Sequence, residues 1–265
     1  MDRYVHVHPT GTREWSSYSA NLFVGCKNNC RYCYARADAL RFGLIKDRSD
    51  WPNMRIKKKL PTQFYKKVDG VIMFPTTHDI FPETLELTVE YLANVLAAGN
   101  QVLIVSKPRK KCIQTIANTF RHDYRNQIKF RFTIGSMQDH VLKFWEPNAP
   151  SFGERVACLA YAWQLGYRTS VSCEPFLDDQ LLDLYYSVNC FINDSFWIGK
   201  MRNIAQRIDV TEWSGGDFDF LHLIQDTHTD EYIKWLYNKM RTKPMVKWKD
   251  SIKKVVGLEP EKEDE

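Results

Sequence analysis

The sequence predicts an α/β fold built from repeated β/α units. Short apolar runs of strand length alternate with longer amphipathic stretches of helix length along most of the 265 residues. The chain is 44% hydrophobic and 14% aromatic, which is ample for a sizeable core, and no low-complexity linker divides it, which favours one domain. Alternation of this kind predicts parallel strands, arranged either as a barrel or as an open doubly wound sheet.

Six segments have the composition of strands, because β-branched and aromatic residues are frequent in them. In chain order they span residues 18–24, 70–74, 101–106, 129–134, 167–173 and 190–196. Most are followed by a stretch long enough for a helix, which is the pattern of a β/α repeat.

Two of the intervening helices carry clear sequence signals. The helix expected at 83–99 has apolar residues on one face and stops at Gly99, a residue that commonly ends helices. The helix expected at 151–166 begins at Ser151, and Glu154 three residues later completes a capping box. Each therefore connects two consecutive predicted strands.

The predicted β/α units fill residues 1–207. Residues 208–265 are expected to form a C-terminal extension with a helix near 229–240, a basic segment and an acidic tail, packed on the same domain. No internal repeat marks a sharper boundary between these parts.

The net charge of +5 is unevenly distributed along the chain. The last seven residues hold five acids and one lysine, so the rest of the chain carries about +9. The densest basic runs lie at 55–59, 107–111 and 239–254. One such run is usually only a solvated surface, but three together favour a nucleic-acid partner.

The sequence contains neither a signal peptide nor a stretch of roughly 20 apolar residues that could cross a membrane. We therefore expect a cytoplasmic protein without a membrane partner. Seven cysteines, an odd number in a chain of this length, do not fit a secreted disulfide framework. They indicate reduced thiols or a metal site.

Three cysteines stand close together directly after the first predicted strand: Cys26, Cys30 and Cys33. Such a loop can wrap its thiolates around one centre, and thiolates suit zinc or an iron–sulfur cluster. Structural zinc normally takes four protein ligands in spaced pairs, which makes zinc the weaker interpretation. The other four cysteines are isolated along the chain: Cys112, Cys158, Cys173 and Cys190. A four-iron cluster held by three thiolates would leave one iron open to a non-protein ligand.

The cysteine spacing, with Tyr32 before the last cysteine, resembles the cluster loop of radical S-adenosylmethionine (SAM) enzymes. The segment NLFVGCKNNCRYCYAR at 21–36 is similar to the opening motif of the spore photoproduct lyase-like group within that family. Further similar segments follow in the same order, at 76–82, 102–108, 145–167 and 196–203. His78 departs from the pattern, because the group is expected to have threonine or serine there.

The resemblance implies an incomplete (β/α)6 TIM-type barrel, with the chemistry at the C-terminal ends of the strands. It implies a [4Fe-4S] cluster whose open iron binds SAM, and reductive cleavage of SAM to a 5′-deoxyadenosyl radical that abstracts hydrogen from a substrate. It also implies an external one-electron donor, flavodoxin-like or ferredoxin-like. The reaction class, whether lyase, isomerase or transferase, and the oligomeric state stay open.

The resemblance and the predicted strand ends together give the candidate site residues. The metal ligands are the three clustered cysteines, and no other catalytic residue is assigned. The candidates for binding SAM are Tyr32, Thr77, His78, Asp79, Lys107, Ser136, Ser172, Glu174, Trp197, Ile198 and Gly199. A lysine suits the methionine carboxylate, carboxylates and serines suit the ribose hydroxyls, and the aromatic ring at 32 could flank the adenine.

The fifth predicted strand allows a test of orientation. Its even-numbered positions from 168 to 174 are polar and its odd-numbered positions are mostly apolar. Because strand side chains alternate between faces, Ser172 and Glu174 are expected to face the site and Cys173 to face the helices. This argues against Cys173 as a hydrogen-atom donor.

For the substrate, the resemblance and the basic body favour DNA, specifically a thymine-derived or otherwise modified base. A base in a duplex would have to be flipped into the barrel, which requires basic residues beside the opening. Alternative substrates are RNA, a peptide or a small molecule. An alternative of another class is a nucleic-acid-binding module with a structural iron–sulfur or zinc site.

Overall fold

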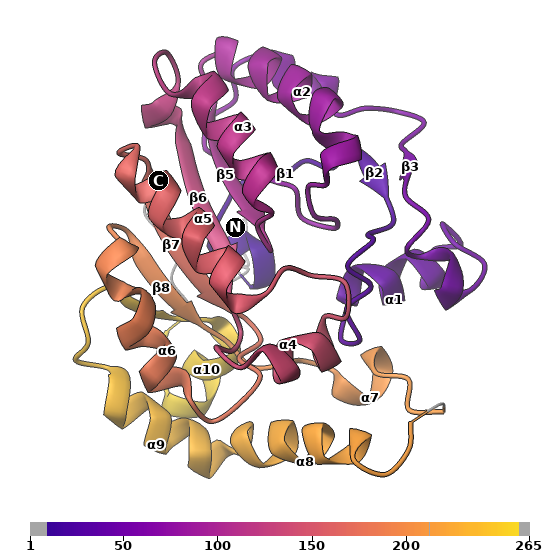
Figure 1. Ribbon diagram of the computed structural model, residues 1–265, viewed down its shortest axis with the longest axis vertical. Coiled ribbons are helices and arrows are strands. Elements are labelled where there is room, and N and C mark those ends of the chain that lie inside the picture. The colour runs from indigo at the N-terminus through magenta and orange to yellow at the C-terminus, as the bar shows by residue number, and fades with distance from the viewer. Residues whose placement is uncertain (1–9, 212, 260–265) are drawn as a thin grey trace, which may run out of the picture.

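Seven parallel strands form the central sheet (Figure 1). The computed structural model describes residues 10–211 and 213–259. In sheet order the strands are β1 (Tyr18–Ser19), β4 (Val71–Phe74), β5 (Gln101–Ser106), β6 (Ile128–Thr133), β7 (Arg168–Cys173), β8 (Ser195–Ile198) and β9 (Val246–Trp248). Within these residues no pairing joins β1 to β9, so the sheet is a partial TIM-type barrel, as the predicted fold class requires.

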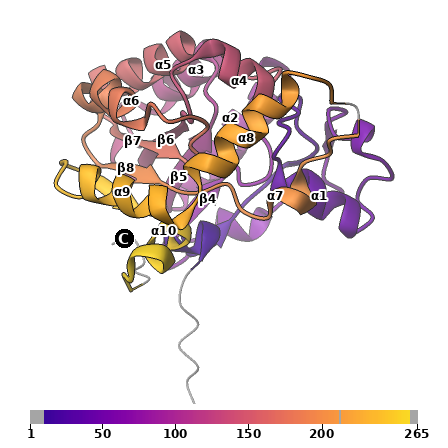
Figure 2. The same cartoon turned by 90° about the horizontal axis from the view of Figure 1, so that it is seen from below.

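Helices cover the outer face of this sheet and its open ends. They are α1 (Tyr34–Arg41), α2 (Leu85–Ala97), α3 (Lys110–Phe120), α4 (Asp139–Trp145), α5 (Phe152–Gln164), α6 (Leu181–Val188), α7 (Ile204–Arg207), α8 (Asp217–Thr227), α9 (Asp230–Met240) and α10 (Asp250–Val256). Figure 1 has α2 at the top and α8 and α9 at the bottom, and Figure 2 views the molecule from the side of α8 and α9. None of the helices in the described part of the chain is long and apolar enough to cross a membrane.

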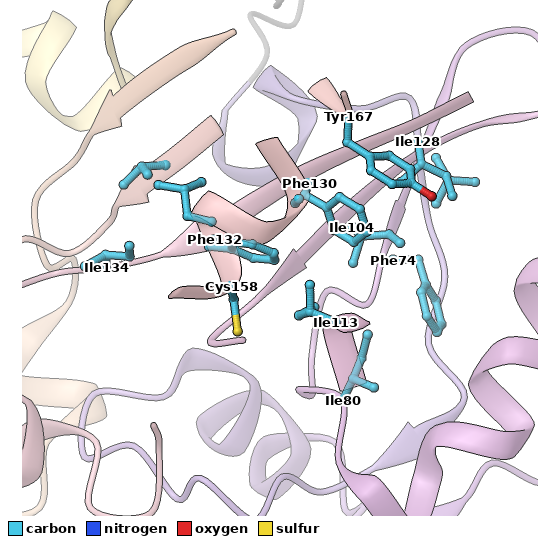
Figure 3. Close-up of a cluster of buried hydrophobic side chains, with 14 of the residues drawn as sticks. Phe74, Ile80, Ile104, Ile113, Ile128, Phe130, Phe132, Ile134, Cys158 and Tyr167 are labelled. Atoms are coloured by element: carbon cyan, nitrogen blue, oxygen red, sulfur yellow. The ribbon is translucent and has the colours of Figure 1, made fainter. Parts of the chain in front are cut away.

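The hydrophobic core lies between the sheet and the helices. Phe130 and Phe132 of β6 pack there with Ile104 of β5, and they meet Ile113 and Cys158 from the helices (Figure 3). Burial of these side chains on the helix-facing side leaves the alternate strand positions to the barrel interior, where polar groups can gather.

The expected first strand is two separate strands. β1 pairs with β4, whereas β2 (Phe23–Val24) pairs antiparallel with β3 (Arg55–Ile56). Between them, the side-chain oxygen of Asn21 accepts hydrogen bonds from the backbone N–H groups of Thr76 and Thr77, both at 2.8 Å. The chain therefore leaves the main sheet at Asn21, which hydrophobicity alone does not reveal.

The last two strands also differ from expectation. The strand expected at 190–196 lies at 195–198, because residues 189–191 form a 3-10 turn. β9 is not among the predicted strands, since it is three residues long, has Lys247 at its centre and is followed by Lys249. It extends the sheet with residues of the expected C-terminal extension, whose acidic tail at 259–265 lies outside the described residues except for Glu259.

The capping box expected at 151–154 forms only in part. The Ser151 hydroxyl accepts a hydrogen bond from the Glu154 N–H at 3.3 Å, as predicted. The Glu154 carboxylate, however, accepts a hydrogen bond from the Lys110 N–H at 2.9 Å. It thereby links the starts of α3 and α5, because the two helices are neighbours.

Side chains bridge the opening of the barrel. Glu14 lies in a 3-10 helix (Gly11–Glu14) just before β1, and Lys249 follows β9. The Lys249 ammonium lies 2.6 Å from the Glu14 carboxylate and 3.6 Å from that of Glu174, and the Asp250 N–H donates to Glu14 at 2.9 Å. Burial raises the pKa of Glu14 to about 7, against the opposing attraction of Lys249. These contacts join the two sheet edges that backbone pairing leaves apart.

Candidate active site

The loop that carries the three clustered cysteines connects β2 to α1. Gly25 opens it at φ +100, and a Cβ there would lie 2.7 Å from the Trp51 carbonyl oxygen. The Cys26 N–H donates to that same carbonyl at 2.9 Å, and the Cys33 N–H donates to the Cys30 carbonyl at 3.2 Å. Cys33 is the N-cap residue of α1. A helix start presents N–H groups and positive partial charge, which favours a thiolate there.

The three thiols are buried or half-buried and border one cavity. Burial raises the pKa of Cys26, Cys30 and Cys33 alike, so the free thiols are protonated without a cation to bind. In residues 10–211 and 213–259, no three His, Cys, Asp or Glu side chains converge as ligands of one metal ion. A four-iron cluster does not require such convergence, because each of its three protein thiolates binds a different iron.

The cavity has a volume of about 600 Å³ and lies at the C-terminal ends of the central strands. Seven of the predicted SAM-binding residues line it: Tyr32, Thr77, His78, Asp79, Lys107, Ser172 and Glu174. They come from the cysteine loop, from the segment after β4, from the end of β5 and from β7. Segments distant in sequence thus meet beside the thiols.

Four predicted residues lie elsewhere. The Ser136 hydroxyl donates to Asp178, and Ile198 packs in the core under the helices. Trp197 packs edge-on against Trp15, with ring centroids 5.8 Å apart. A Cβ on Gly199 would lie 2.8 Å from the Glu174 side chain, so this glycine leaves room for a residue that does line the cavity.

Asp79 ties the cysteine loop to β5. One of its carboxylate oxygens accepts from the Ser106 hydroxyl and the Lys107 N–H, both at 2.7 Å. The other accepts from the Asn28 side-chain amide at 2.6 Å and lies 4.0 Å from the Cys26 sulfur. With these partners, the buried carboxylate mainly fixes the position of the loop.

His78 holds the strand that leads into the loop. Its Nε2 accepts from the backbone N–H groups of Leu22 and Phe23, at 3.2 and 3.4 Å, and its Nδ1 lies 3.0 Å from the Asp79 carbonyl oxygen. This pattern requires a neutral ring with the proton on Nδ1. Burial lowers the pKa of His78 to about 4, which agrees with the neutral form.

A buried charge network that the sequence analysis did not identify lies behind the loop. Glu146 makes an ion pair with Arg155, accepts a hydrogen bond from the Tyr32 hydroxyl, and lies 3.8 Å from the Lys107 ammonium. Burial opposes the charge on Lys107, but the negative potential of its surroundings, which include the Glu146 carboxylate, outweighs burial and holds the pKa of Lys107 well above its ordinary value. Glu146 and Arg155 both belong to the segment 145–167 singled out above, which was the available signal.

The alternation expected for β7 is present. Ser172 lines the cavity, whereas Cys173 packs in the core under the helices, with its sulfur 2.9 Å from the Ile134 carbonyl oxygen. Cys112 and Cys158 belong to the same core and Cys190 is exposed. No cysteine lines the cavity apart from the three of the loop.

Further basic residues line the cavity: Arg13, Lys200, Arg202 and Arg207. Arg202 pairs with Asp250 at 3.0 Å, and the Arg207 guanidinium lies 5.7 Å from the centre of the Tyr34 ring. The sequence analysis missed them because they are dispersed and none belongs to a dense basic run. Lys200 lies 3.6 Å from Asp230, so two of the four cations are paired with carboxylates. The four residues, which we call the rim cations, add positive charge to the cavity lining, and this suits an anionic ligand.

No protein-family model matches the chain. An uncharacterized protein of Acidianus two-tailed virus is 24% identical over 186 residues, which are 65% of this chain and 60% of that protein. An uncharacterized protein of Methanocaldococcus jannaschii is 24% identical over 177 residues, which are 65% of either chain. The matches therefore span less than two thirds of the length of both curated relatives.

Solved structures of spore photoproduct lyase resemble the protein over most of its length. The enzyme complexed with dinucleoside spore photoproduct has a TM-score of 0.60 at 15% identity, over 93% of this chain and 79% of that chain. A mutant with bound AdoMet and dinucleoside spore photoproduct has a TM-score of 0.55 at the same identity and coverage. The resemblance inferred from the sequence is thus confirmed for the fold.

Proposed function

We propose that this protein is a radical SAM enzyme that binds a [4Fe-4S] cluster through Cys26, Cys30 and Cys33. One observation carries the proposal: three thiols of a single loop border a cavity of about 600 Å³ that polar strand ends line. The donor set fits the group, because thiolates are the usual ligands of such clusters and no fourth cysteine reaches the cavity. The fold, shared with spore photoproduct lyase, adds support.

When bound, the cluster would supply one electron to SAM, which yields the 5′-deoxyadenosyl radical. The chain's own part is binding and exclusion of water. Lys107, 3.8 Å from Glu146, would donate hydrogen bonds to the methionine carboxylate. The Ser172 hydroxyl would donate to or accept from the ribose hydroxyls, and the Glu174 carboxylate would accept from them. Tyr32 and Trp51 are buried in the same wall and shield the thiols from solvent.

We propose that the substrate is a nucleic acid, specifically a thymine-derived or otherwise modified base in DNA. Spore photoproduct lyase, which has a similar fold, is known in complex with dinucleoside spore photoproduct. The rim cations of this cavity suit a phosphate backbone. All seven cysteines are free, which fits a protein of the reducing cytoplasm.

The deciding experiment is anaerobic. The protein is reconstituted with iron and sulfide, SAM and dithionite are added, and 5′-deoxyadenosine is measured. We expect the parent protein and Cys173→Ala to form 5′-deoxyadenosine and Cys30→Ala to form none, because Cys173 lies in the core away from the cavity. A protein that retains zinc, or a cluster-containing protein that forms no 5′-deoxyadenosine with any nucleic-acid substrate, contradicts the proposal.

The substrate is tested separately. Binding of thymine-lesion oligonucleotides is measured for the parent and for Lys200→Gln with Arg207→Gln. Loss of these rim cations should weaken binding of DNA and reduce its salt dependence, because each cation that contacts a phosphate releases counterions. Unchanged binding would exclude the rim as the DNA contact.

A further inference from the structure

An apolar surface lies on the outer side of the cysteine loop. Four exposed apolar side chains belong to the two segments there, α1 with its following loop and β3: Leu40, Phe42, Leu44 and Ile56, with exposed fractions of 36%, 66%, 47% and 59%. We call this surface the outer patch. α1 and the loop that follows it project beside β3 at the edge of the molecule (Figure 1). Arg55 of β3 donates a hydrogen bond to the Leu44 carbonyl, which brings the loop and the strand together.

The segment that carries Leu40, Phe42 and Leu44 is anchored by neighbouring residues that pack against the thiols. The Leu44 and Ile45 N–H groups donate to the Ala39 carbonyl, at 2.8 and 3.3 Å. Ile45, Ala39 and Trp51 belong to one buried cluster that also contains Cys26 and touches Cys33. One buried cluster therefore joins the segment that carries the patch to the cysteine loop.

The surface around the patch is positively charged. Residues 36–59 include eight basic and three acidic side chains. Asp38 pairs with Arg41 at 3.1 Å, and Asp50 accepts from the backbone N–H groups of Lys46 and Asp47, so two of the acids are engaged locally. In the described part of the chain, Lys46, Lys58 and Lys59 are exposed and make no ion pair.

We propose that the outer patch and its basic border are the docking surface for an acidic one-electron carrier protein. An exposed apolar centre with a charged rim is the usual anatomy of a protein interface, and cations around it complement an acidic partner. A nucleic acid fits less well, because only one of the four patch side chains, Phe42, offers an aromatic face for bases to stack on. None of the four patch residues lines the cavity, so the surface is distinct from the substrate site.

The inference rests on the proposed function, since it assumes a cluster in the cysteine loop. The step it describes is the transfer of one electron from the reduced carrier, which is oxidised by one equivalent, to the cluster, which is reduced by one equivalent. No bond forms or breaks and no proton is required.

The test compares two reductants on the reconstituted protein. Loss of cluster absorbance is followed by anaerobic stopped flow with dithionite or with a reduced flavodoxin of high negative charge. We expect Phe42→Asp, and separately Leu44→Asp, to slow reduction by flavodoxin about tenfold or more, because a carboxylate there repels the acidic partner and disrupts the apolar contact. Reduction by dithionite should change less than about twofold, since a small ion needs no docking surface.

Two further variants complete the design. Lys58→Glu with Lys59→Glu should slow reduction by flavodoxin without touching the apolar centre, and added salt should slow the parent more than this variant. Trp235→Asp is the matched control, because Trp235 is an aromatic residue of α9 that is 50% exposed outside the patch. It should be reduced by flavodoxin at the parental rate.

The outcomes separate the two proposals. If flavodoxin reduces the cluster and the patch variants slow that reduction, but no 5′-deoxyadenosine forms, the proposed function is overturned and the docking surface is supported. Formation of 5′-deoxyadenosine with dithionite, together with parental flavodoxin rates in Phe42→Asp and Leu44→Asp, would overturn the docking surface. Patch variants that lose DNA binding or change oligomeric state, with flavodoxin rates unchanged, would also overturn it.

Discussion

At the scale of single residues, the wall of the cavity is held by buried polar side chains whose hydrogen bonds are satisfied inside the protein. His78, Asp79 and Glu146 are each less than 10% exposed, and each connects segments far apart in the sequence. A buried polar group contributes little net stability while it is paired, but it costs much once a partner is lost. Substitutions at these positions should therefore affect both stability and the thiol loop.

His78 should make the protein acid-sensitive in a defined range. Its pKa is lowered from 6.5 to about 4 by burial, so between those values the unfolded chain binds more protons than the folded one. Stability should thus be retained above pH 6.5 and fall by about 3 kcal/mol as the pH drops to 4, since one pKa unit is about 1.36 kcal/mol. Urea unfolding across this range should give a flatter profile for His78→Gln.

Two other groups titrate in or near the same pH range, so the parent must be compared with His78→Gln at each pH. Burial lowers the pKa of His228 to about 3, which acts in the same direction, whereas the raised pKa of Glu14 acts in the opposite direction between 4.5 and about 7. The difference between the parent and His78→Gln removes both contributions. Equal slopes of unfolding free energy against pH for the two proteins would show that burial does not lower the pKa of His78 and would contradict this prediction.

Glu146 should be one of the most sensitive positions in the molecule. Glu146→Gln removes the only carboxylate that pairs with Arg155 in the described residues and leaves that guanidinium buried without a countercharge. Loss of one partner of a buried ion pair costs about 3–5 kcal/mol, so unfolding should occur at clearly lower urea concentration. The double variant Glu146→Gln with Arg155→Met should recover part of that loss, and no recovery would argue that the pair itself is not the cause.

At the scale of elements, the cysteine loop depends on a turn that only glycine can make there. Gly25 has φ +100 and its missing Cβ leaves space for the Trp51 carbonyl, so β2, the loop and the segment before β3 can meet. The loop then ends at the start of α1, where Cys33 occupies the N-cap position. This local geometry places the three thiols, which are close in sequence, along one wall of the cavity.

Gly25→Ala should destabilise the protein and lower its cluster content. Two costs combine, the positive φ and a contact of 2.7 Å with a backbone oxygen that cannot move freely. We expect a loss of about 2–4 kcal/mol in urea unfolding and fewer iron atoms per chain after reconstitution. Gly43→Ala is the matched control, because Gly43 also has positive φ (+66) but no atom within 4 Å of the added Cβ. It should cost about 1 kcal/mol and keep its iron, and equal iron loss in both variants would contradict the steric explanation.

At the scale of the whole molecule, the barrel is closed by side chains rather than by backbone pairing. Glu14 before β1 and Lys249 after β9 meet across the opening, and the Lys249 ammonium also lies 4.0 Å from the centre of the Trp15 ring. The same lysine approaches Glu174, which lines the cavity. The two ends of the chain therefore influence the site, although neither carries a cluster ligand.

Lys249→Met should open this side of the barrel. The substitution leaves Glu14 buried beside Asp250 and should cost about 3–5 kcal/mol, most of all above pH 7 where Glu14 is ionised. Amide hydrogen exchange should accelerate in β1 and β9 before it does in β5 and β6. Lys254→Met is the control, since Lys254 is 62% exposed and lies 4.0 Å from Asp250, and it should cost less than about 0.5 kcal/mol. Uniform exchange in Lys249→Met would argue against a local opening.

Much of this architecture follows from the sequence alone. Strands of four to six residues are predicted to within about two residues, at 71–74, 101–106, 128–133 and 168–173, because burial on one or both faces imposes a pattern that the sequence shows. The same is true of α2, α5 and α9, whose amphipathic repeats and ends are local properties. The alternation in β7 likewise placed Ser172 and Cys173 on opposite faces.

Other features could not be predicted because no local pattern encodes them. β9 has three residues and exists as a strand only because β8 offers it an edge. Ser136, Trp197, Ile198 and Gly199 follow or end strands as predicted, but packing against Asp178, Trp15 and Glu174 keeps them out of the cavity lining. No local sequence pattern distinguishes the rim cations and Glu146 from other charged residues, because only the folded chain places them at the site.

The sequence by itself determined the β/α repeat, the three cysteines on one loop and the face that each β7 side chain presents. These features depend only on hydrophobic periodicity and on short spacing along the chain, which do not depend on how distant segments pack. Only the tertiary structure decided which distant polar groups meet. Asp79 reaches Asn28, Glu146 reaches Lys107, and Glu14 reaches Lys249 across the open barrel. Such contacts are set by how helices and strands pack in three dimensions. The sequence around a charged residue does not indicate which distant residue it will pair with.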